Sequence, residues 1–219
     1  QDATLTANML DNAKGLLQSA ASLALHIAQD IDNRAGKISA RQRLDVQGNA
    51  ADAATGKLNN AAGQLLSGDN LTVRAQSVDN RQGGLLYSEQ QMQLRLNDVL
   101  DNRQGKLQSG EGLQLDARSL LNTSGTIDSQ QQLALRIAGL LDNSSGALRS
   151  NGDQQISAGQ VDNRQGVFSS RGAITLATPL LDNTSGTLIS QGRGVYRIGT
   201  LNNQQGKLHS GDALTLDTT

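Results

Sequence analysis

The chain has 219 residues, a formal net charge of −1 from 19 basic and 20 acidic residues, and no cysteine. This composition excludes disulfide bonds and thiolate chemistry, and it lacks the basic excess of a protein that binds nucleic acid or an anionic membrane surface. No apolar stretch is long enough to span a membrane. With 24 glycines, two tyrosines, one phenylalanine and no tryptophan, aliphatic side chains must fill a narrow interior.

An asparagine followed three residues later by a glycine recurs ten times, at intervals close to twenty residues. The asparagines are Asn12, Asn33, Asn60, Asn80, Asn102, Asn122, Asn143, Asn163, Asn183 and Asn203. Their glycine partners are Gly15, Gly36, Gly63, Gly83, Gly105, Gly125, Gly146, Gly166, Gly186 and Gly206. A sustained period of this length predicts a solenoid in which each repeat forms one coil. Residues 1–219 are therefore expected to form a single module.

Each repeat predicts three short strands. In residues 98–122, Leu100 precedes the asparagine, Leu107 follows the glycine, and Leu113 and Leu115 come next as an apolar–polar–apolar segment. Such alternation places the apolar residues on one face of each strand and the polar residues on the other. The sequence thus predicts an all-β fold, a right-handed parallel β-helix of about ten coils with three strands in each coil.

The asparagine and the glycine predict one corner of each coil. The asparagine is in phase with the buried residue two positions earlier, so we expect its amide to point inward and hydrogen-bond to its neighbours in a ladder. We expect the glycine to supply the positive φ angle of a tight turn. A serine four residues after most of these glycines is expected to line the next corner.

Read from the N-terminus, the pattern has two irregularities. Between the second and third coils, residues 47–57 are predicted to form a loop or a single helical turn outside the rod. A smaller slip occurs at Gly83 and Gly84. From Asn102 to Asn203 the repeat is regular. The pattern has no polar cap at either end, which predicts that the module is excised from a longer chain.

An aspartate before the asparagine in seven repeats is the main candidate for chemistry. These residues are Asp11, Asp32, Asp79, Asp101, Asp142, Asp162 and Asp182. A column of carboxylates could bind Ca²⁺ or act on a polysaccharide as paired acids. An arginine two residues later in four repeats, and the preference of aspartate for turns, favour a structural interpretation. His26 and His209 are isolated, so we expect no catalytic residue, no metal site and no cofactor.

Segments such as LDNRQGKLQSGEGLQLDARSLLN and LLDNTSGTLISQGRGVYRIGTLNN resemble the repeats of filamentous haemagglutinins. This family comprises large two-partner-secreted exoproteins of Gram-negative bacteria, both adhesins and contact-dependent growth-inhibition effectors. The resemblance implies a β-helix shaft secreted to the extracellular face of the outer membrane. It also implies an outer-membrane two-partner transporter, recognised through a domain that we do not find in this sequence, and a receptor on a host or target cell.

Two functions remain open from the sequence. The first is a structural shaft segment that serves adhesion or the delivery of a toxin to neighbouring bacteria. The alternative is an extracellular polysaccharide-active β-helix enzyme, a lyase or hydrolase, which the aspartate column motivates. The uniform repeat favours the first function, because catalytic carboxylates would gather on a few special coils.

Overall fold

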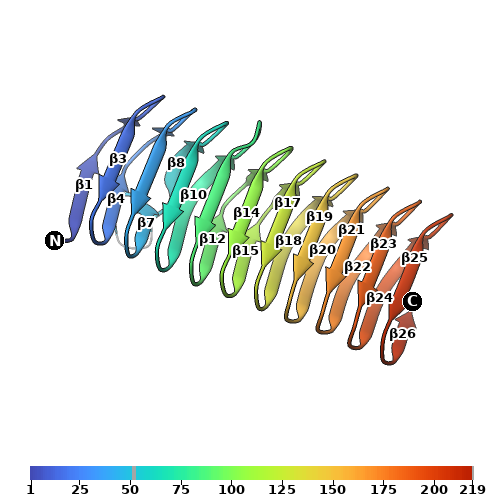
Figure 1. Cartoon of the computed structure of the whole chain (residues 1–219). Coiled ribbons are helices and arrows are strands. Elements are labelled where there is room, and N and C mark those ends of the chain that lie inside the picture. The colour runs from blue at the N-terminus through green and yellow to red at the C-terminus, as the bar shows by residue number, and fades with distance from the viewer. Residues whose placement is uncertain (51–52, 219) are drawn as a thin grey trace.

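The computed structural model describes residues 1–50 and 53–218, and in this part of the chain 26 strands and no helix are formed. The strands wind into a right-handed parallel β-solenoid of about eleven turns, drawn in Figure 1 as a rod with its termini at opposite ends. The predicted fold is therefore confirmed. No helix in the described residues is long and apolar enough to cross a membrane.

Two parallel sheets form the walls of the solenoid. In the first sheet, eleven strands follow one another along the rod: β1 (Ala3–Ala7), β4 (Leu23–Ile27), β7 (Leu44–Gln47), β10 (Leu71–Asp79), β12 (Met92–Leu96), β15 (Leu113–Ala117), β18 (Leu133–Asp142), β20 (Gln154–Asp162), β22 (Ile174–Asp182), β24 (Gly194–Asn202) and β26 (Leu214–Asp217). The same sheet includes β2 (Leu10–Asp11), β5 (Ile31–Asp32), β8 (Thr55–Asn59), β13 (Val99–Asp101) and β16 (Ser119–Leu121).

The second sheet has ten strands, one for each asparagine corner. They are β3 (Leu16–Ser19), β6 (Lys37–Ala40), β9 (Gln64–Ser67), β11 (Leu85–Ser88), β14 (Lys106–Ser109), β17 (Thr126–Ser129), β19 (Ala147–Ser150), β21 (Val167–Ser170), β23 (Thr187–Ser190) and β25 (Lys207–Ser210). In five coils the first and third predicted strands join into one continuous strand, as in β10 and β18. This joining explains why three strands in each coil make only two sheets.

The register stacks equivalent residues of successive coils. Leu113 pairs with Leu133, and Leu107 pairs with Ile127, so apolar side chains of one coil lie against those of the next. Leu107, Ile127 and Leu133 have no exposed surface. The interior is thus a continuous aliphatic column, and each coil depends on its neighbours to bury its apolar face.

Two aromatic side chains, Phe168 and Tyr196, are fully buried within this column. Gly194 pairs with Ile174 in the position that aliphatic residues occupy in most coils. A Cβ atom at Gly194 would lie 3.1 Å from the hydroxyl oxygen of Tyr196, so the missing side chain leaves room for the phenol. Burial raises the pKa of Tyr196 to about 12.

The predicted loop at residues 47–57 is too wide at both ends. Gln47 ends β7, and Thr55 begins β8, which pairs with β5 and β10. The connection therefore spans residues 48–54, of which 51–52 lie outside the described residues. The N–H of Gly48 donates a hydrogen bond to the carbonyl of Ala53 (2.8 Å) and closes the base of the connection. The strand β8 begins as early as Thr55 because Ala75 of β10 pairs with Thr55.

Candidate functional site

The ten repeated asparagines lie at one corner of the solenoid and form an unbroken chain of amide hydrogen bonds. The Nδ2 atom of each of the first nine donates to the Oδ1 atom of the asparagine in the following coil, at 2.7 or 2.8 Å. The eight asparagines from Asn33 to Asn183 have no exposed surface, whereas Asn12 and Asn203 are half-buried. This column, named the amide ladder below, satisfies polar groups that would otherwise be unpaired inside the protein.

Each asparagine also closes the turn in its own coil. The N–H of Gly146 donates to the backbone carbonyl of Asn143 (2.9 Å), and the Nδ2 atom of Asn143 donates to the carbonyl of Gly146 (3.2 Å). Equivalent pairs occur in the other coils apart from the fourth. The asparagine therefore links turn geometry to coil stacking, which explains its spacing from the glycine.

The predicted reason for the corner glycines is wrong in nine of the ten coils, and Gly83 in the fourth coil is the exception. In these nine coils a positive φ angle, 52–60°, belongs to the residue before the glycine: Lys14, Ala35, Ala62, Gln104, Ser124, Ser145, Gln165, Ser185 and Gln205. Glycine is required for space. A Cβ atom there would lie less than 3.0 Å from the Oδ1 atom of its own asparagine and, after the first coil, from the backbone oxygen of the asparagine in the preceding coil. In the fourth coil Gln82 (57°) and Gly83 (79°) both have a positive φ angle.

Gly84, rather than Gly83, occupies the corner-glycine position of the fourth coil, and the predicted positive φ angle is found at Gly83. Gly83 has a φ angle of 79°, but a Cβ atom on it would contact nothing within 4 Å. Gly84 makes the close approach instead, and the Nδ2 atom of Asn80 donates to its carbonyl at 3.0 Å. Gly83 is an additional residue in this turn, and Ser88 lies four residues after Gly84, as the repeat requires.

The serines line the second corner. The hydroxyl of Ser67 shares its one proton between the carbonyls of Asn70 and Gln42, both at 2.7 Å. Ser109 makes the same shared contact with the carbonyls of Gly112 and Gln90 at 2.8 Å. Because the two acceptors lie in adjacent coils, each hydroxyl joins a turn to the coil before it.

The seven aspartates cap the asparagine turn from outside. In each, Oδ1 accepts a hydrogen bond from the backbone N–H two residues later, at 2.9–3.3 Å. In four coils an arginine at that later position also binds the carboxylate, with nitrogen–oxygen distances of 2.5–2.8 Å. The carboxylates of the aspartate column are thus engaged in hydrogen bonds and ion pairs within the turns.

At Asp32, Asp79 and Asp162, the arginine two residues later holds the pKa of the carboxyl below its ordinary value. The Arg34 side chain, with the backbone N–H of Arg34, lowers the pKa of Asp32 despite partial burial. Burial of Asp162 would raise the pKa of its carboxyl, but hydrogen bonds and charge from Arg164 outweigh burial and lower it. A general acid needs a pKa near the working pH, so carboxylates held in this way are poor proton donors.

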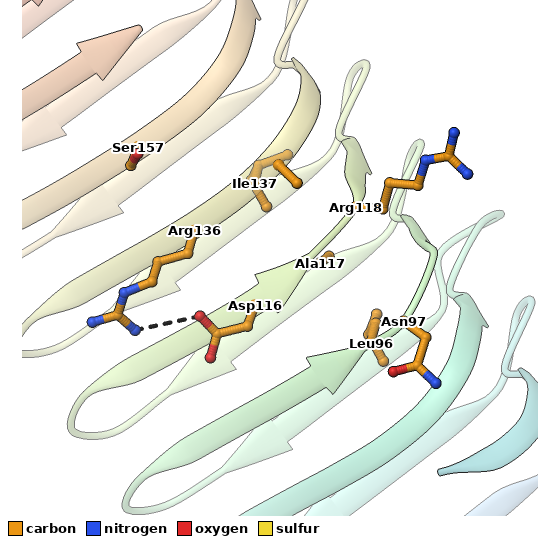
Figure 2. Close-up of a pocket in the computed structure, with 9 residues that line it drawn as sticks. Leu96, Asn97, Asp116, Ala117, Arg118, Arg136, Ile137 and Ser157 are labelled. Atoms are coloured by element: carbon orange, nitrogen blue, oxygen red, sulfur yellow. Dashed lines mark hydrogen bonds and ion pairs between the residues drawn. The ribbon is translucent and has the colours of Figure 1, made fainter.

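A shallow depression of about 780 Å³ lies on the outer face of the first sheet, where β12, β15 and β18 approach a corner (Figure 2). Leu96, Ala117 and Ile137 form its apolar part. Asp116 and Arg136 form an ion pair across neighbouring strands at 3.3 Å. The lining holds one carboxylate, whereas glycoside hydrolysis ordinarily uses two. Across residues 1–50 and 53–218, no three His, Cys, Asp or Glu side chains gather where they could hold a metal ion.

The fold and its corners define a β-solenoid shaft, built from one coil repeated along its length. The model of the haemagglutinin repeat family matches residues 1–61, 48–97, 92–145, 136–193 and 175–219, which together cover the chain. The chain therefore belongs to the haemagglutinin repeat family. This family is structural and adhesive, and it suggests a secreted or cell-surface exoprotein. No curated protein and no solved structure matched the chain.

Proposed function

We propose that this chain is a structural shaft segment of a secreted, cell-surface filamentous exoprotein. The segment extends from a bacterial cell and serves adhesion or contact-dependent delivery of a toxin to neighbouring bacteria. The observation that carries the proposal is the repetition of one coil, with one amide ladder from Asn12 to Asn203, in a chain that the family model matches along its length. At about 4.8 Å for each strand step, ten steps give a rod of roughly 50 Å, a shape suited to spanning distance.

Secretion in this proposal uses an outer-membrane two-partner transporter, and the rod reaches the extracellular face of that membrane. A receptor on a host or target cell is the second partner. The absence of cysteine supports this route, because a chain without thiols crosses an oxidising compartment without cross-linking. No observation on the aspartate column favours the polysaccharide-active enzyme, since the turns use these carboxylates.

The test uses the full-length natural protein with an epitope tag in the exposed turn at Gln130–Gln131. We expect the tag to be labelled on intact cells and to disappear from the surface when the transporter is deleted. A tag found only in the cytoplasm would contradict the proposal. Adhesion and delivery are separated by a second measurement. Purified segment that blocks attachment to host cells supports adhesion, and loss of growth inhibition after deletion of whole coils supports delivery.

A further inference from the structure

One aromatic side chain lies on the outside of the rod. Tyr87 of β11 is half-buried on the outer face of the second sheet, whereas Phe168 and Tyr196 are fully buried. Tyr87 stands in register with Leu66 of β9 and Ser39 of β6. An aromatic and a leucine side by side make a local apolar platform on this outer face.

A hollow lies beside this platform because Ser39 is smaller than its neighbours. The hollow has a volume of about 340 Å³ and is lined by Ser39, Leu66 and Tyr87 with the polar side chains around them. Ser39 is only 7% exposed, and its Oγ atom has no hydrogen-bond partner. A buried hydroxyl without a partner is unfavourable, and in native proteins such a group is usually satisfied by water or a ligand.

The rim of the hollow carries charge that the protein does not neutralise. Lys37 and Arg41 contribute two cations and Glu89 contributes one carboxylate. No ion pair is formed by these three side chains within residues 1–50 and 53–218. Both cations line the same hollow as the unpaired Ser39 hydroxyl. The excess of one positive charge there favours a ligand that carries a carboxylate.

We propose that this hollow, the Tyr87 cleft, binds an acidic saccharide. The apolar face of a sugar ring packs on Tyr87 and Leu66, a sugar hydroxyl bonds to Ser39, and the sugar carboxylate faces Lys37 and Arg41. An extended peptide fits less well, because β6, β9 and β11 are already paired on both sides and offer no free backbone groups. The binding chemistry can be tested on the chain alone, while its use in adhesion rests on the proposed function.

The size of the cleft suits a short oligosaccharide. It extends from Gln18 of β3 to Tyr87 of β11, across three strand intervals. At about 4.8 Å for each interval this is roughly 14 Å, longer than a single sugar ring. The ligand therefore crosses the strands and lies along the rod.

The chain itself supplies a reporter for binding. It has no tryptophan and only two tyrosines, so a Tyr196→Phe variant leaves Tyr87 as the single tyrosine. We expect oligogalacturonate, hyaluronan oligosaccharides or sialyllactose to change its fluorescence in a saturable manner. Uncharged malto-oligosaccharides should bind about tenfold more weakly, as expected for the loss of one charge-assisted contact.

Substitutions at outward positions of the second sheet that are equivalent to Tyr87 locate the site, with affinities measured by calorimetry. Tyr87→Ala is expected to lower affinity about tenfold, the scale of one aromatic contact. Ser39→Leu fills the hollow and should also abolish binding while Tyr87 is retained. Ile189→Ala is the matched control, because Ile189 of β23 occupies the equivalent outward position far along the rod and should leave affinity unchanged.

The proposal is overturned if none of the three acidic saccharides binds, if neutral sugars bind equally well, or if Tyr87→Ala and Ile189→Ala have the same effect. Melting curves of each variant confirm that affinity is compared between folded proteins. These outcomes are independent of surface labelling of the full-length protein. A failed binding test with a labelled surface removes only the saccharide site, whereas a cytoplasmic tag removes the proposed function.

Discussion

Replacing Gly146 with alanine tests the central steric claim about the corner. The added Cβ atom would lie less than 3.0 Å from the backbone oxygen of Asn122 and 2.7 Å from the Oδ1 atom of Asn143. A backbone oxygen cannot rotate away, so the two coils must separate locally. The side-chain hydrogen bond from Asn122 to Asn143 (2.8 Å) would break. Three nearby backbone hydrogen bonds, donated by the N–H groups of Asn122 (2.7 Å), Ser124 (3.1 Å) and Ala147 (2.9 Å), would break with it.

At about 1 kcal/mol for each net hydrogen bond, loss of these four bonds should lower the free energy of unfolding by about 4 kcal/mol. Gly83→Ala is the matched control, because its Cβ atom contacts nothing and only the φ angle of 79° is unfavourable, at a cost of about 1 kcal/mol. Urea titrations followed by far-ultraviolet circular dichroism measure both values. Equal losses would refute the steric explanation and restore the conformational one.

Three further predictions follow from the stacking. Asn143→Ala should lower the free energy of unfolding, measured by urea titration, by about 3 kcal/mol, since it removes two hydrogen bonds of the ladder and leaves the Oδ1 atom of Asn163 unpaired. An unchanged free energy of unfolding would mean that the ladder adds nothing to stability. Deleting residues 142–161 should leave a folded rod because Leu141 and Val161 are register partners, whereas deleting 142–151 should not, and equal thermal melts would contradict this register. A raised phenol pKa contributes stability below the unfolded value near 10 that is lost as pH rises through about 12. Tyr196→Phe should therefore resist alkaline unfolding between these values, and an unchanged alkaline midpoint would contradict the burial effect.

The coil, its three segments and its inward residues could be predicted because the period fixes them. A residue such as Leu107 recurs at one phase in every repeat, and strand alternation then assigns its face. The merging of two segments into β18 could not be predicted. The corner between them is a gentle bend that the backbone crosses without interrupting the strand, and β18 shifts register against β20 between Ile137 and Leu140 to absorb an additional residue.

The glycine role was missed because two physical causes produce the same spacing. A turn with a left-handed residue and a close backbone approach both place glycine near the asparagine. The distinguishing signal lies one residue earlier, where Lys14, Ala35, Gln104 and Ser124 are all unbranched at Cβ and so tolerate positive φ better than valine or isoleucine would. The Tyr87 cleft could likewise not be predicted from the sequence, because the register that brings Ser39 beside Leu66 spans the insertion at residues 48–54.

Every amide in the ladder points the same way, with its nitrogen toward the C-terminal end of the rod. The column is therefore vectorial: one terminal surface of any stack of these coils offers a carbonyl, and the other offers an N–H. Two such surfaces of the same kind would set oxygen against oxygen or hydrogen against hydrogen. Growth of the stack is thus restricted to head-to-tail addition, and a chain emerging gradually through a pore can use each finished coil as the oriented template for the next.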